Sequence, residues 1–188
     1  MQRITIMGLT MLATFAIVCV GAVSVSASGS EFIASTTGKV KDKQTNVQVF
    51  KLGSGGSVEC AEVTGYGEIT ELKSVTNKEV LTYSGCSGGG PVKVSPAYFE
   101  FNANGSAKLE KTVTVVAEGG AGCEVVLEPQ TLEKVAYSNT SSGITATAKV
   151  KNVHSKGTGG GCGTTNTEDT YTGSIAAELE GGGKLEWK

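Results

Sequence analysis

Short runs of alternating apolar and polar residues make up most of the chain after residue 30, and clusters of glycine separate them. The runs are dense in valine, threonine, isoleucine and tyrosine, which suit a pleated strand better than a helix. Several keep the two-residue period of a strand with one buried face. The runs expected to form strands are 38–43, 46–52, 57–63, 67–73, 79–84, 97–102, 107–116, 124–127, 132–137, 144–153, 170–180 and 184–187.

These runs predict an all-β fold, an antiparallel sandwich or barrel-like domain of ten or more short strands. Asn104-Gly105 tolerates the positive φ angles of a tight hairpin turn and is expected to join 97–102 to 107–116. Segments 132–137 and 144–153 are expected to pair, as are 170–180 and 184–187. The pattern leaves the buried face of 46–52 open, because Val47 and Val49 lie opposite Gln48 and Phe50.

The N-terminal segment has the pattern of a secretory signal peptide. An apolar run over 4–23 is followed by small residues up to Ala27 and then by polar residues. A run of about 20 apolar residues is also long enough for an uncleaved membrane anchor. The small-residue site favours cleavage after Ala27. We therefore expect a signal peptide over 1–27, a single all-β domain over 28–188, and a protein secreted or held in the cell envelope, with no membrane span after cleavage.

The 161 residues after Ala27 contain an even number of cysteines, which an oxidising compartment would pair. Four cysteines allow three connectivities. We favour Cys60 with Cys86 and Cys123 with Cys162, because each pair closes a local loop of two strands. The chain-entropy model assigns roughly 3 to 4 kcal/mol of stabilisation to each loop.

Charge and glycine content exclude several classes of protein. After cleavage 15 lysines face 18 acidic residues, a net charge of −3 without long runs of one sign. This composition offers no footprint for nucleic acid or acidic membranes. The 25 remaining glycines cluster instead of recurring at every third position, which excludes collagen.

Candidate catalytic and metal-binding residues each have a simpler structural interpretation. Ser87 lies in a G-x-S-x-G match, but the only histidine, His154, follows it in the chain, the reverse of the chymotrypsin order. A hydrolase elbow would need a helix that this pattern lacks. We therefore interpret 85–89 as a glycine turn holding a disulfide cysteine, and His154 as an exposed polar side chain. We therefore expect no catalytic residue and no cofactor. We also expect no metal site, because the ligand spacing of zinc sites is missing.

Paired carboxylates would suit glycoside hydrolysis, and exposed aromatic rings would suit glycan binding. Glutamates that alternate along a strand usually form its solvated face, and the loop 166–169 lacks the acidic spacing of a calcium loop. Trp187 is either docked in a final strand or exposed as a stacking platform, and burial is favoured. The local acidic clusters are Glu68 with Glu71, Glu178 with Glu180 and Glu186, and Glu168 with Asp169. The aromatic set is Tyr66, Tyr98, Phe99, Phe101, Tyr137, Tyr171 and Trp187.

Three stretches resemble a large group of small exported proteins of unknown function from soil actinobacteria. They are SEFIASTTGKVKDKQTNVQVFKLGSGGSVECAEV, TYSGC around Cys86, and EPQTLEKVAYSNTSSGITATAKVKNVHSKGTGGGCGTTNTEDTYTGSIAAEL. The resemblance covers nearly the whole mature chain. Such proteins often carry a further cysteine pair in the middle, and 95–101 and 111–116 hold none here. The resemblance implies no activity, cofactor or catalytic residue.

The leading hypothesis is a non-catalytic exported β domain that binds a cell-surface glycan or protein. One alternative is a secreted, glycosidase-like hydrolase with paired carboxylates. The other is a structural envelope component without a specific ligand.

Overall fold

The computed structural model describes residues 29–188 except 119–121, 160–161 and 163–164, and it is all-β. The predicted signal peptide lies outside the described residues. The strands are β1 (Phe32–Ala34), β2 (Gly38–Lys51), β3 (Ser57–Ile69), β4 (Lys73–Ser74), β5 (Thr76–Ser87), β6 (Pro91–Val94), β7 (Ala97–Asn102), β8 (Ser106–Leu109), β9 (Val113–Ala117), β10 (Glu124–Leu127), β11 (Gln130–Glu133), β12 (Val135–Asn139), β13 (Gly143–Thr158), β14 (Thr165–Leu179) and β15 (Leu185–Trp187).

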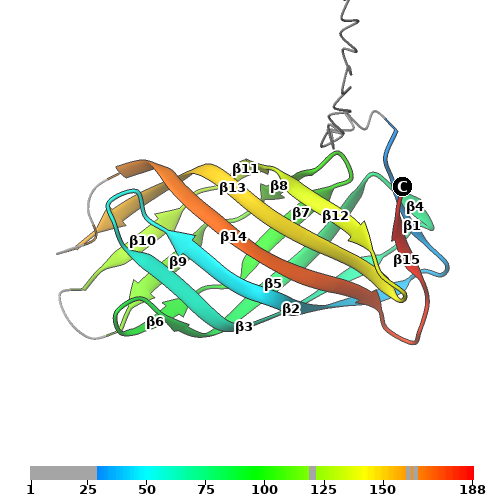
Figure 1. Cartoon of the computed structure of the whole chain (residues 1–188), viewed down its shortest axis with the longest axis horizontal. Helices are drawn as coiled ribbons and strands as arrows, with labels where there is room; N and C mark the ends of the chain where they lie inside the picture. Colours follow the sequence, from blue (N-terminus) through cyan, green and yellow to red (C-terminus); the bar gives the residue numbers. More distant parts are fainter. Residues whose placement is uncertain (1–28, 119–121, 160–161, 163–164) are drawn as a thin grey trace, which may run out of the picture.

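Eight antiparallel strands close into a barrel (Figure 1). Around the ring, the order is β3, β2, β14, β13, β10, β9, β6 and β5, which pairs again with β3. Short β6 completes the ring because it pairs with both β5 and β9. Strands β7, β8 and β11 extend the wall from β5, and β12 pairs with β13. The prediction of an antiparallel barrel-like fold is therefore confirmed.

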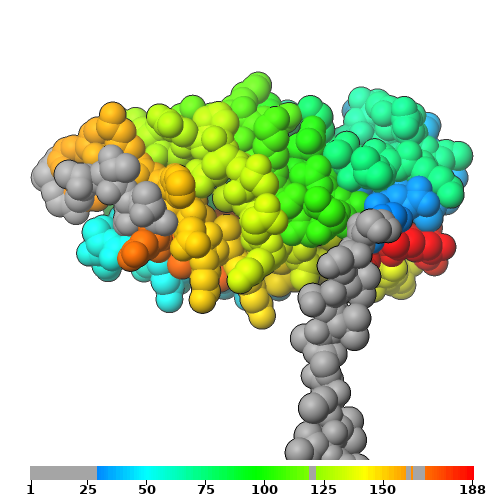
Figure 2. Space-filling view, turned by 90° about the horizontal axis from the view of Figure 1, so that it is seen from above, coloured from blue at the N-terminus to red at the C-terminus, as the bar shows by residue number. Residues whose placement is uncertain are grey.

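A small second sheet lies at one end of the barrel and joins the two ends of the described chain. Strand β1 pairs with β15 on one side and with β4 on the other. Figures 1 and 2 show the blue N-terminal and red C-terminal segments side by side at this end. The predicted pairing of 170–180 with 184–187 is wrong, because β13 and β2 already occupy both edges of β14. Gly181 and Gly182, both with positive φ, turn the chain away to β1.

Alternating side chains fill the barrel interior. In β7, Ala97, Phe99 and Phe101 are buried while the residues between them are partly exposed. In β2, Gln48 and Phe50 point inward, and Val47 is 48% exposed. The hydrophobic pattern alone could not predict which face of β2 is buried around residue 48. A register shift between Lys43 and Gln48 interrupts the alternation of inward and outward side chains.

Both predicted disulfides are confirmed. Cys60 and Cys86 occupy directly paired positions on β3 and β5 and are buried. The second bond joins Cys123, next to the start of β10, to Cys162 in the connection between β13 and β14. The Asn104-Gly105 turn between β7 and β8 is confirmed too, with Gly105 at φ 89°.

Candidate functional site

Three apolar side chains form a row across the outer wall of the barrel. Tyr66 on β3 is paired with Val80 on β5, and Val80 is paired with Tyr98 on β7. Their sequence neighbours Gly65, Glu79 and Phe99 face the interior, so strand alternation turns the row outward. Tyr66 is 64% exposed. We call Tyr66, Val80 and Tyr98 the outer row.

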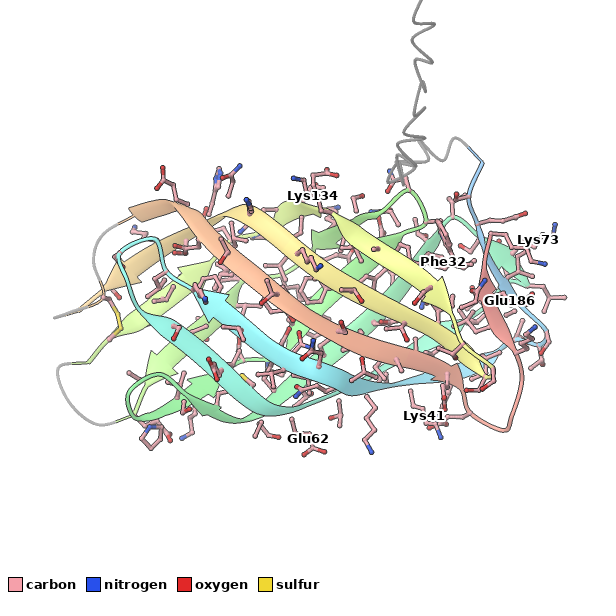
Figure 3. All side chains as sticks on the ribbon, viewed as in Figure 1. Phe32, Lys41, Glu62, Lys73, Lys134 and Glu186 are labelled. Atoms are coloured by element: carbon pink, nitrogen blue, oxygen red, sulfur yellow. A yellow bond between two sulfur atoms is a disulfide. The ribbon has the colours of Figure 1, made fainter. Side chains whose placement is uncertain are left out.

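A depression of about 580 Å³ lies over the outer row, and charged residues surround it. Lys78 is held between two carboxylates, with its Nζ 2.9 Å from Glu110 Oε1 and 3.2 Å from Glu100 Oε2. Hydrogen bonding to Glu110 raises the pKa of Lys78, and the same contact lowers the pKa of Glu110. Figure 3 shows Lys41 and Glu62 on the same wall projecting into solvent.

One tyrosine of the row is covered by a lysine. The Nζ atom of Lys111 lies 3.7 Å from the centroid of the Tyr98 ring. This is a cation–π contact, which uses the same ring face that a sugar or another apolar group would stack on. The ring of Tyr66 has no such cover in the part of the chain that the structure describes.

A pair of buried carboxyl groups lies directly behind the outer row. Asp42 on β2 is paired with Gly65, and Glu79 on β5 is paired with Gly67, two residues along the same strand β3. Side chains from β2 and β5 can meet over β3 because these two glycines leave room. A Cβ atom on Gly65 would lie 2.5 Å from Asp42 Oδ2.

Both carboxyls of this pair hold a proton more tightly than usual. Burial raises the pKa of Asp42 to about 7, and burial together with the charge of Asp42 raises the pKa of Glu79. Asn77 Nδ2 donates to Glu79 Oε1 over 2.5 Å. Among the described residues, the Asp42 oxygens receive no hydrogen bond from a permanent donor. The Glu79 carboxyl is their neighbour, and it can donate to them only when it is protonated.

A second polar group spans the middle of the barrel. Gln48 donates from Nε2 to the Ser174 carbonyl over 3.0 Å, and Tyr171 donates to Gln48 Oε1 over 2.5 Å. The Tyr83 and Tyr171 hydroxyls lie 3.4 Å apart. Burial raises the pKa of Tyr83 to about 12. Gly173 makes room for this group, because a Cβ there would collide with the Gln48 amide.

The interior leaves little free volume for a ligand. Cavities of about 70, 30 and 20 Å³ lie among the core side chains. Ligand pockets usually exceed about 300 Å³. These cavities are therefore packing voids, and the larger depressions lie on the outer surface, one of them over the outer row.

Ser87 and His154, interpreted from the sequence as a turn residue and an exposed polar side chain, lie on strands that are not neighbours in the sheet. Ser87 is exposed at the end of β5, and His154 is exposed on β13, a strand that does not pair with β5. The Gln130 side chain bonds the backbone N–H and carbonyl of His154. The glycine loop 157–163 lies partly outside the described residues. The described residues contain no group of three or more histidine, cysteine or acidic side chains placed to hold a metal ion.

The acidic clusters noted in the sequence do not form the carboxyl pair. Glu178 accepts a hydrogen bond from Ser142 Oγ over 2.6 Å, and Glu186 pairs with Lys184 at 2.6 Å. Sequence reasoning missed Asp42 and Glu79, although a signal was present. Strand alternation places Asp42 on the same face as buried Val40, and Glu79 on the same face as buried Leu81.

Trp187 is docked and not a stacking platform. Its Nε1 donates to the Ala103 carbonyl over 2.9 Å, and its ring centroid lies 5.9 Å from that of Tyr137. The Asn139 side chain bonds both the N–H and the carbonyl of Trp187. Trp187 is partly buried and packs against the core, so the favoured docking in a final strand is borne out, whereas Tyr66 is an exposed aromatic residue.

Comparison with models of protein families, with curated proteins and with solved structures found no match to this chain. The resemblance to small exported actinobacterial proteins therefore stays a prediction. Over the ranges that the structure describes, no helix is long and apolar enough to cross a membrane.

Proposed function

We propose that this protein is a non-catalytic exported β domain of the cell envelope or medium, and that it binds a surface component through the outer wall of its barrel. One observation carries the proposal. The barrel interior is filled by side chains, whereas an exposed tyrosine lies in a depression of about 580 Å³ on the outer wall. A ligand is therefore recognised from outside.

Export is supported by the two disulfides, which are consistent with an oxidising extracellular environment. The signal peptide pattern over 1–27 supports the same location. A bacterial origin rests on the resemblance alone.

The position of the carboxyl pair supports a non-catalytic role. A glycosidase needs its two carboxyls about 5 to 9 Å apart, with the sugar between them. Asp42 and Glu79 are buried next to each other inside the barrel wall, which leaves no space for a sugar between them. The outer-wall carboxylates Glu100 and Glu110 share one lysine.

The test uses the protein as recovered after export. We expect saturable binding to isolated cell-envelope material and no turnover of glycans, esters or peptides. Turnover that disappears on changing one carboxylate would establish the hydrolase alternative. A protein that binds no envelope material saturably, yet is abundant in the envelope, would be the structural component.

A further inference from the structure

The outer row has the spacing needed to contact one extended chain at two points. Neighbouring strands lie about 4.8 Å apart, so the backbone positions of Tyr66 and Tyr98, two strands apart, are separated by about 10 Å. This separation is comparable to the length of a disaccharide in an extended polysaccharide. Alternate rings of such a chain can therefore reach both tyrosines while the ring between them lies over Val80.

The chemistry of the outer row suits the C–H face of a sugar. Tyrosine offers a broad apolar ring and a polar hydroxyl at little entropic cost, since its side chain has few rotatable bonds. Val80 keeps the floor between the rings apolar. Charged groups surround this floor and can bond the hydroxyls at a sugar's edge, and Lys78 is already held in place by Glu100 and Glu110.

The charges around the outer row nearly balance, which favours an uncharged ligand. Five lysines and four glutamates lie on or beside the row, so the wall has little excess charge to attract a charged polymer over long range. The lysines are Lys39, Lys41, Lys78, Lys108 and Lys111, and the glutamates are Glu68, Glu100, Glu110 and Glu180. A stable protein interface buries about 800 Å² on each side around an apolar core, and the apolar part of this wall is a single row of three side chains.

We infer that the outer row binds a neutral, extended β-linked polysaccharide, with sugar rings stacked on Tyr66 and Tyr98. This inference rests on the proposed function and names its ligand class and site. Lys111 occupies the Tyr98 ring in the free protein, so the polysaccharide must displace it.

Titration calorimetry with soluble β-1,4-linked glucan, mannan and xylan oligosaccharides, and with polygalacturonate as the charged control, tests the inference. Tyr66→Ala and Tyr98→Ala are each expected to weaken binding of a neutral oligosaccharide about tenfold. Lys111→Ala is expected to strengthen it about 2- to 5-fold, because the ring face is then free. Leu72→Ala is the matched control, since Leu72 is also exposed (51%) but lies beside the small end sheet.

Three outcomes would overturn the inference. They are no binding of any neutral oligosaccharide, preference for polygalacturonate, or a Tyr66→Ala variant that binds as tightly as the unaltered protein. A binding assay with isolated envelope material distinguishes these outcomes from a failure of the proposed function. If the unaltered protein and Tyr66→Ala bind that material equally and saturably, only the site is wrong. If neither binds it, the proposed function fails as well.

Discussion

Two aspartates face the barrel interior from neighbouring strands, and their hydrogen bonding differs. Asp169 on β14 is fully buried, yet Oδ1 accepts the Gly53 N–H over 2.9 Å and Oδ2 accepts the Ser155 hydroxyl. Asp42 on β2 is only 4% exposed, and among the residues that the structure describes its oxygens have no donor other than Glu79. Burial alone therefore does not determine the energetic state of a buried carboxyl. The number of hydrogen-bond donors that contact it also matters.

The same comparison separates a carboxyl that ties strands together from a carboxyl whose pKa is raised by burial. The donors at Asp169 tie β14 to β13 and to the turn after β2. Asp42 and Glu79 act on each other's pKa, and the charge of Glu79 also raises the pKa of Tyr137. The charge of Asp42 raises the pKa of Glu79, so the two carboxyls titrate as a coupled pair.

The largest effect is expected from Asp169→Ala. It leaves the Gly53 N–H and the Ser155 hydroxyl without an acceptor, and it should lower the free energy of unfolding by about 4 kcal/mol. Ser155→Ala is the matched control, because it removes one donor and keeps the carboxylate, and it should cost about 1 kcal/mol. Denaturant unfolding with both disulfides intact measures the two losses. Equal losses in the two variants would contradict the role assigned to Asp169.

A smaller effect, opposite in sign, is expected from Asp42→Asn. The folded-state pKa of Asp42, about 7, lies above the unfolded value of 3.8. The folded protein therefore holds more protons between these values, and this contribution to stability falls as pH rises from about 4 through 7. Asparagine removes that fall, so the variant should be about 2 kcal/mol more stable than the unaltered protein at pH 8 and similar to it at pH 4.

Denaturant unfolding across pH 4 to 8 measures the difference between Asp42→Asn and the unaltered protein. Other titrating groups are the same in both proteins, so the difference in the free energy of unfolding reports on the carboxyl pair. A constant difference across the whole range would show that the carboxyl pair does not hold the extra proton.

The smallest effect is expected from Gly65→Ala. The added Cβ would lie 2.5 Å from both Asp42 Oδ2 and Leu81 Cδ2, and the crowding should cost about 1 to 2 kcal/mol. Gly90→Ala is the control, since nothing lies within 4 Å of a Cβ there, and it should change stability by less than about 0.5 kcal/mol. A neutral Gly65→Ala variant would contradict this crowding. It would mean that water or loose packing around the carboxyl pair makes room for the added methyl group.

Local features determined much of this protein from sequence alone. Alternation and β-branched residues predicted strands such as β7 and β10 with their observed bounds, and Asn104-Gly105 predicted its hairpin. Each cysteine pair closes a local loop, so spacing was enough to favour the observed bonds. Tyr66 and Tyr98 were recognised as aromatic candidates, but their common row depends on the registers of β3, β5 and β7.

Strand pairing across long stretches of chain was decided only by the tertiary structure. A two-residue period tells which side chains share a face, but it carries no information about which strand lies alongside. Closure through β6 and the pairing of β15 with β1 therefore could not be read from the pattern. Asp42 and Glu79 meet because β3 lies between their strands and has glycines at positions 65 and 67, a contact that exists only once three strands are in register.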